Sequence, residues 1–268
     1  SDIRTIAQTV HKRGIFLIVD EAHGAHLAFS PYFPDSALEL GADVVIQSVH
    51  KTLPSLTQTA LLHISRQVPE KRAQFLEDRL SRYLGVYQTS SPSYVLMAGI
   101  DQCIEWTAAH QAEFDAFGKR LEVFRNRIRN LEAIKLLEVA GMDRSKILLS
   151  AAGRGVSGQE LSDRLRKEHH IEMEMSCSTY ACAITTVADR EEELSRFAQA
   201  LEELERMLET RPEQSREERE KDTVIRTEQI CTIEEAFQKE TRVCTVEETE
   251  GAVSGGFVMP YPPGIPLL

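Results

Sequence analysis

The chain has 268 residues, 42% of them hydrophobic and 27% charged, enough to bury the core of one large domain or of a large domain with a smaller satellite. Its 31 basic and 42 acidic residues leave a formal net charge of −11, which argues against a surface for nucleic acid or for an anionic membrane. No apolar run approaches the ~18 residues of a membrane span and no signal peptide is recognised, so a cytoplasmic location is expected. The five cysteines lack metal-binding spacing, which fits a reducing compartment.

The first third of the chain is predicted to alternate helices and strands. A helix at about 2–13 should end at Gly14, and a strand at 15–19 should follow it. A short helix at about 35–40 then leads to a second strand at 43–47. Strand, helix and strand at this spacing form a βαβ unit, whose strands should be parallel with a right-handed crossover.

Further elements are expected in the middle of the chain. A strand is predicted at 59–64, a helix at 69–84, and helical periodicity over about 93–131. The last segment carries one apolar stripe, formed by Leu121, Phe124, Ile128 and Leu131. This stripe could be an interface or part of the core, and core packing is the favoured interpretation.

After Gly141 the pattern is typical of a small α+β domain. The predicted elements are a strand at 146–151, a helix at 157–168 capped by Ser157, strands near 171–177 and 180–186, and a helix at 189–208. The charged segment 211–222 is interpreted as a solvated linker. A short helix at about 232–238 and a strand near 242–246 should follow.

Two short stretches combine apolar runs with polar ends: Ile-Phe-Leu-Ile-Val-Asp-Glu-Ala-His at 15–23 and Val-Val-Ile-Gln-Ser-Val-His-Lys at 44–51. Each is interpreted as a buried strand, and open α/β sheets place their sites at the carboxyl ends of such strands. Asp20 and Lys51 should therefore project into one crevice. A lysine amine can hold an aldehyde cofactor as a Schiff base, and a carboxylate can keep a pyridine nitrogen protonated. This pair suggests pyridoxal phosphate chemistry.

The neighbours of Asp20 and Lys51 suit the same chemistry. Ser48 and His50 could donate hydrogen bonds to a phosphate. Ala22 is small enough to lie under a flat ring, and His23 could hydrogen-bond the cofactor or the substrate.

Other interpretations of these residues remain open. Asp20 could simply cap the turn that follows its strand. His23 and His26 have H-x-x-H spacing, but no third ligand lies nearby in sequence beyond Glu21 or Asp35, so no metal site is expected.

The sequence Asp-Glu-Ala-His at 20–23 is also the Walker B signature of DEAH-type helicases. That alternative is disfavoured, because the chain has no G-x-x-x-x-G-K-[ST] motif and lacks the arginine-rich pattern that motors use to track phosphates.

Four segments, in this order, resemble the Orn/Lys/Arg decarboxylase family, whose members are pyridoxal-phosphate enzymes. They are Asp-Glu-Ala-His-Gly-Ala-His at 20–26, Ser-Val-His-Lys at 48–51 with Ser-Leu-Thr-Gln at 55–58 after it, Gln-Thr-Ser-Ser-Pro-Ser-Tyr at 88–94, and Tyr-Pro-Pro-Gly-Ile-Pro at 261–266. The chain is most similar to the arginine-decarboxylase-like branch.

The resemblance implies an α/β fold and a division into domains. Part of the mainly parallel pyridoxal-phosphate-transferase sheet of the aspartate aminotransferase fold is expected, followed by a smaller α+β domain. The implied division is 1–135 for the carboxyl-terminal part of the cofactor-binding large domain, 136–210 for the small α+β domain, and 211–268 for a linker and the start of a C-terminal domain.

The resemblance also implies roles for individual residues. Lys51 would be the Schiff-base lysine and Asp20 the partner of the pyridine nitrogen, and His23, from its position after Asp20, is a further catalytic candidate. The cofactor contacts would be completed by Ala22 beneath the ring and by Ser48 and His50 at the phosphate. Thr89, Ser90 and Ser91 resemble a turn that reaches the cofactor phosphate of the partner subunit, which implies a homodimer.

The implied reaction is decarboxylation of arginine, lysine or ornithine to a polyamine or its precursor. An aminotransferase, a carbon–carbon bond-forming synthase of the same fold and a non-catalytic relative remain alternatives. The family's upstream phosphate loop and ring-stacking histidine have no counterpart in this sequence, and neither has the segment after Tyr-Pro-Pro-Gly. We therefore expect a truncated chain that is inactive by itself.

Overall fold

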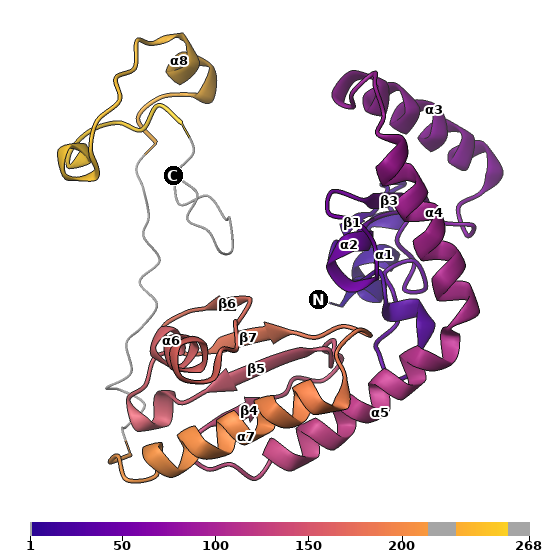
Figure 1. Cartoon of the computed structure of the whole chain (residues 1–268). Coiled ribbons are helices and arrows are strands. Elements are labelled where there is room, and N and C mark those ends of the chain that lie inside the picture. Colours follow the sequence, from indigo (N-terminus) through magenta and orange to yellow (C-terminus); the bar gives the residue numbers. More distant parts are fainter. Residues whose placement is uncertain (1, 214–228, 257–268) are drawn as a thin grey trace. The chain divides into compact units, whose positions relative to one another are not determined.

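The computed structural model of the chain describes residues 2–213 and 229–256 (Figure 1). It divides into two compact units. The first comprises residues 1–131, 136–147 and 184–204, and the second comprises 132–135, 148–183 and 205–268. Within the described residues, no helix combines the length and apolar character needed to cross a membrane.

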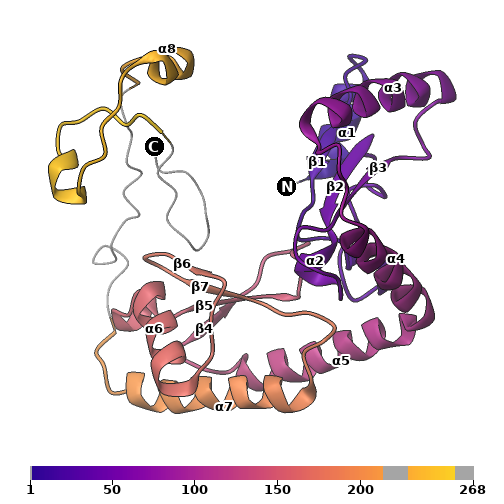
Figure 2. The ribbon, with the colours of Figure 1, turned by 45° about the horizontal axis from the view of Figure 1, so that its top comes forward.

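The first unit is built around a three-stranded sheet in the order β1-β2-β3. Its strands are β1 (Ile18–Asp20), β2 (Val44–Ser48) and β3 (Ala60–Ile64), which lie side by side in Figure 2. β1 and β2 are parallel, as the sequence predicts, and Asp20 lies opposite Ile46. β3 runs antiparallel to β2. The helix before the sheet, α1 (Ile3–His11), is followed by Gly14 with a φ of +71°.

The strand predicted at 15–19 begins later, at Ile18. Its ladder starts where Val44, the first residue of β2, offers a partner to Ile18. β1 is also an edge strand, and Ile15 and Ile18 are 53% and 55% exposed, so the expectation of a buried first strand is wrong. β2 is the central strand, and its first residue, Val44, is fully buried.

The connection between β1 and β2 contains no α-helix, so the helix predicted at 35–40 is wrong. The connection instead contains the short 3₁₀ helix η1 (Leu27–Phe29) and a turn at 37–41. The backbone N–H of Ala37 donates to the Glu21 carboxylate, which holds the start of this turn in place. Gly41, with a φ of +101°, then redirects the chain into β2.

α2 (Val49–Thr52) follows β2 directly, and β3 is followed by α3 (Glu70–Tyr87), α4 (Tyr94–Ala109) and α5 (Gln111–Ile128). The helical segment predicted at 93–131 is therefore two helices, separated at His110, whose φ of −119° and ψ of 35° are not helical. Leu121, Phe124 and Ile128 are buried, which confirms core packing for that part of the apolar stripe.

A second sheet has the order β4-β5-β7-β6. Its strands are β4 (Lys135–Leu137), β5 (Lys146–Ser150), β6 (Met175–Ser176) and β7 (Ala181–Ile184). β4 is not predicted from the sequence, and β6 and β7 are shorter than expected. The remaining elements after β4 are η2 (Ala152–Arg154), α6 (Gly158–His169), α7 (Glu191–Leu208), α8 (Ile233–Gln238) and η3 (Val246–Thr249).

The predictions for the later helices are largely confirmed. Ser157 caps α6 by accepting a hydrogen bond of 3.1 Å from the backbone N–H of Glu160. The strand predicted near 242–246 is wrong, because this segment leads into η3, whose cap is Thr245. Most of the predicted linker at 211–222 and the Tyr-Pro-Pro-Gly segment at 261–264 lie outside the described residues.

Candidate active site at the ends of the paired strands

The parallel pairing of β1 and β2 brings their carboxyl ends together. Beyond the ladder, the N–H of Glu21 donates to the carbonyl of Ile46 at 2.9 Å, and the N–H of Ser48 donates to the carbonyl of Ala22 at 3.3 Å. The polar segments that follow the two strands therefore run side by side, as the sequence predicts.

Lys51 and His23 are in direct contact across this strand end. The Nζ of Lys51, an exposed residue of α2, lies 3.1 Å from Nε2 of His23. Nε2 of His23 faces the amine and can accept a hydrogen bond from it. The pair thus places a proton acceptor next to the amine.

Asp20 ends β1 with an exposed side chain. Its Oδ1 accepts a hydrogen bond of 3.0 Å from the N–H of Ala22. This is the turn cap that the sequence allows as an alternative interpretation, and it occupies one carboxylate oxygen. The cap holds the Asp20 carboxylate at the turn that follows β1.

Ser48 and His50 flank the start of α2. Within the described part of the chain, the Ser48 hydroxyl makes no capping hydrogen bond to this helix, although Ser48 is its N-cap residue. The Nδ1 of His50 donates to the carbonyl of Thr59 at 2.9 Å. The other ring nitrogen could therefore donate to a phosphate only when the ring is doubly protonated.

The turn at Thr89, Ser90 and Ser91 lies between α3 and α4 and is exposed. Its Ser91 N–H donates to Thr89 Oγ1 at 3.2 Å. No hydrogen bond of the described residues joins this turn to Asp20, His23 or Lys51.

Glu21 is a structural residue that the sequence analysis missed, having considered it only as a metal ligand. Its carboxylate accepts hydrogen bonds from Ser36 Oγ at 2.9 Å and from Gln47 Nε2 at 2.6 Å, besides the one from Ala37. The available signal was the lone amide of Gln47 in an otherwise apolar strand.

His26 does not share a ligand with His23. Its Nε2 lies 3.3 Å from Oδ1 of Asp143, a residue that no local pattern relates to it. Among residues 2–213 and 229–256, no group of three His, Cys, Asp or Glu side chains could hold a metal ion.

Known proteins are similar in sequence to the part of the chain that forms this site. The family model for the major domain of Orn/Lys/Arg decarboxylases matches residues 1–148. The chain belongs to the Orn/Lys/Arg decarboxylase family. An arginine decarboxylase of Bacillus subtilis is similar to it, with 29% identity over 278 residues that cover 100% of this chain and 55% of that protein. The chain thus spans about half the length of the curated relatives it matches.

Solved structures show the fold of this family member. The constitutive lysine decarboxylase of E. coli is similar to it with a TM-score of 0.66 at 16% identity, over 100% of this chain and 49% of that one. An alanine–glyoxylate aminotransferase of Nostoc sp. is similar over 74% of this chain and 56% of that one, with a TM-score of 0.54 at 18% identity. These similarities confirm the predicted α/β fold, that of pyridoxal-phosphate enzymes of fold type I.

The side chains at the ends of β1 and β2 fit the cofactor of this family. Members of the family are pyridoxal-phosphate enzymes, and the cofactor presents an aldehyde, a pyridine nitrogen and a phosphate. The ends of β1 and β2 and the following helix α2 offer an exposed amine (Lys51), an exposed carboxylate (Asp20) and the hydroxyl of Ser48, which does not cap the helix. This set of groups matches the three functions of the cofactor in chemical type.

Proposed function

We propose that the protein, in its full natural length, is a pyridoxal-phosphate-dependent decarboxylase of a basic amino acid. The observation that carries the proposal is the contact of 3.1 Å between Lys51 and His23 beside Asp20, in a member of the Orn/Lys/Arg decarboxylase family. Arginine is the first candidate substrate, because the Bacillus subtilis relative is named an arginine decarboxylase, and lysine and ornithine follow. The product would be a polyamine or its precursor.

In this proposal Lys51 holds the cofactor and Asp20 sets the protonation of its pyridine nitrogen. The amine of Lys51 would hold the aldehyde carbon covalently, with the carbonyl oxygen lost as water, and the carboxylate of Asp20 would keep the pyridine nitrogen protonated. Ala22 would leave room for the ring, and Ser48 and His50 would contact the phosphate. The bound cofactor supplies an electron sink for the electron pair that remains when the substrate carboxylate leaves as CO2.

His23 would accept a proton from the Lys51 amine and return it. An ammonium has no lone pair and cannot attack an aldehyde, so Lys51 must first lose a proton. Nε2 of His23 lies within hydrogen-bond distance and can take that proton, which leaves a neutral amine on Lys51 and an imidazolium on His23. The same ring can return the proton when the amine is released.

Three further features belong to the proposal. The protein would act as a homodimer in which Thr89, Ser90 and Ser91 reach the cofactor phosphate of the partner subunit. Its location would be the cytoplasm, where its five cysteines stay reduced. Its domains would divide at 135/136 and 210/211.

Chemical trapping tests the role of Lys51. The full-length protein, incubated with pyridoxal phosphate, is reduced with borohydride and digested, and the peptides are mapped by mass. We expect the adduct on Lys51, its loss in Lys51→Arg, and its retention in the control Lys71→Arg, which changes an exposed lysine of α3. An adduct confined to another lysine would contradict the assignment.

Product analysis tests the reaction. The full-length protein is incubated separately with arginine, lysine and ornithine, and CO2 is measured together with agmatine, cadaverine and putrescine. We expect CO2 and one amine in equal amounts. Transfer of the amino group to a keto acid without CO2 would instead assign the protein to the aminotransferases.

A further inference from the structure

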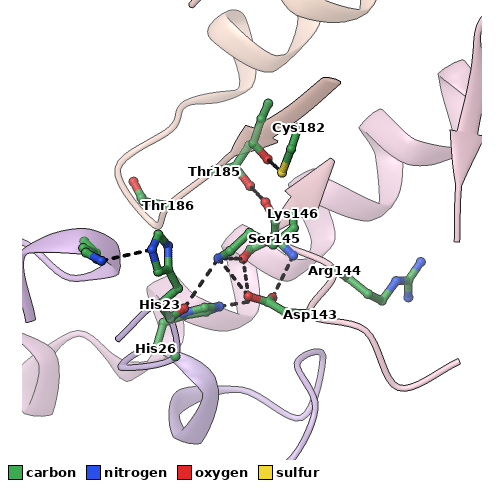
Figure 3. Close-up of polar contacts among 12 residues, drawn as sticks. His23, His26, Asp143, Arg144, Ser145, Lys146, Cys182, Thr185 and Thr186 are labelled. Carbon is green, nitrogen blue, oxygen red and sulfur yellow. Dashed lines mark hydrogen bonds and ion pairs between the residues drawn. The ribbon is translucent and has the colours of Figure 1, made fainter. Parts of the chain in front are cut away.

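The loop that carries His23 is tied to a segment more than a hundred residues away in sequence. Lys146 Nζ donates to the carbonyl of His23 at 3.5 Å, and Asp143 Oδ1 accepts from His26 Nε2 at 3.3 Å (Figure 3). Both segments belong to the first compact unit. Two tethers therefore hold the short stretch 23–26, one on its backbone and one on a side chain.

Asp143 is the centre of these tethers. Its carboxylate also accepts hydrogen bonds from Lys146 Nζ at 2.9 Å and from the N–H and Oγ of Ser145 at 2.9 and 2.8 Å. Burial raises the pKa of Asp143, but the hydrogen bond from His26 and the charge of Lys146 outweigh it and hold that pKa well below its usual range. The carboxylate stays ionised and can bind several donors at once.

The segment 143–146 is itself held firmly. Arg125 is fully buried, and its Nη1 donates to the carbonyls of Arg144 at 3.0 Å and Lys146 at 3.4 Å. Thr185 donates to the carbonyl of Ser145 through its N–H at 3.1 Å and its hydroxyl at 2.7 Å. Asp143 and Lys146 thus project from a backbone whose carbonyls are fixed from both sides.

The other end of the network is equally constrained. The His26 ring is 2% exposed and packs edge-on against Phe33, with 4.7 Å between ring centroids. A buried ring that can donate to one carboxylate has a single favourable orientation. The backbone of His23 and the ring of His26 are therefore both held by the segment 143–146.

We propose that Asp143 and Lys146 are positioning residues that hold His23 in its hydrogen bond with Lys51. The inference rests on the proposed function for the use made of Lys51, whereas the coupling itself can be measured without cofactor. Loss of the Lys146 tether should release the His23 carbonyl and let its ring move away from the amine. Lys51 would then lose its hydrogen bond with His23.

Acetylation by a small neutral anhydride measures this coupling, because an amine released from its hydrogen bond reacts more readily. The full-length protein without added cofactor is labelled briefly at fixed pH, and the rate at each lysine is read by peptide mass mapping. We expect Lys146→Met to raise the rate at Lys51 about three- to tenfold, the effect of losing one hydrogen bond. Lys146→Arg, which keeps a cationic donor, should restore most of the slow rate.

A double-mutant cycle shows whether the effect passes through His23. His23→Phe removes the acceptor directly and should raise the rate at Lys51 by a similar factor. In that background Lys146→Met should add nothing, because the coupling has already been broken. If each substitution raised the rate at Lys51 and the two effects multiplied in the double variant, the proposal would be overturned.

Matched controls separate positioning from unfolding. Lys119→Met, which removes an exposed lysine of α5, should leave the rate at Lys51 unchanged. In Lys146→Met the other lysines should keep their rates, whereas general acceleration would assign Lys146 a merely structural role and overturn the proposal. Because no cofactor is added, a failed trapping experiment at Lys51 would refute the proposed function without affecting this result.

Discussion

The side-chain amide of Gln47 donates a hydrogen bond of 2.6 Å to the carboxylate of Glu21, and so joins β2 to the residue that follows β1. Because Ser36 and Ala37 donate to the same carboxylate, Glu21 also fixes the connection between the two strands. The segments that carry Asp20 and Lys51 therefore depend on a residue with no proposed part in the chemistry.

Glu21→Ala should destabilise the protein. The substitution leaves three donors without their acceptor, and we expect the free energy of unfolding to fall by about 2–3 kcal/mol. Urea unfolding monitored by circular dichroism measures this loss. The control Glu39→Ala changes an exposed glutamate of the same connection and should stay within about 0.5 kcal/mol of wild type. Equal stability of the two variants would contradict the role of Glu21.

Gly24→Ala should be destabilising for a steric reason. A Cβ at this position would lie 2.3 Å from Cγ of Glu21, whose carboxylate is held by its hydrogen bonds and cannot move away without losing them. We expect a loss of about 1–3 kcal/mol. Gly85→Ala is the matched control, because a Cβ there meets nothing within 4 Å and alanine favours the interior of α3. Thermal melting should move down in the first variant and slightly up in the second.

Asp20→Asn should separate cofactor binding from turnover if the proposed function holds. The amide oxygen can still accept from the N–H of Ala22, so the turn after β1 should survive. A neutral amide cannot keep the pyridine nitrogen protonated, and we expect turnover to fall about 100-fold while the trapped adduct on Lys51 remains. Asp35→Asn, an exposed change in the β1–β2 connection, serves as the control. Near-normal turnover in Asp20→Asn would remove this residue from the mechanism.

His63 should make stability depend on pH. Burial lowers the pKa of this β3 residue, opposed by the negative charge of Glu21, and its Nε2 is buried without a hydrogen-bond partner among the described residues. As pH falls through about 6.5, the unfolded state takes up the proton first, so the free energy of unfolding decreases. Above that pH His63 is neutral in both states and does not reduce the free energy of unfolding.

His63→Gln tests this pH dependence, because glutamine does not titrate. Between pH 7.5 and pH 5.5 the unfolding free energy of the wild type should fall relative to that of the variant, as measured by urea titrations at each pH. A difference that stays constant over this range would show that His63 does not titrate differently in the two states.

The sequence by itself determined the strand-end pattern and the family. Apolar runs that stop at Asp20 and shortly before Lys51 are local signals, and parallel pairing of neighbouring strands follows from their spacing. The cap of α6 at Ser157 is equally local, because its acceptor and donor are three residues apart. Features of this kind depend on residues that are close in the sequence, so periodicity and composition reveal them.

Only the tertiary structure decided how the site is held. The exposure of Ile18 depends on the edge position of β1, and the missing helix at 35–40 depends on a carboxylate 16 residues earlier that binds the Ala37 N–H. The contacts of His26 with Asp143 and of His23 with Lys146 join residues 117 and 123 positions apart. No local periodicity encodes such pairs, because their energy comes from buried groups that find partners only after the chain has folded.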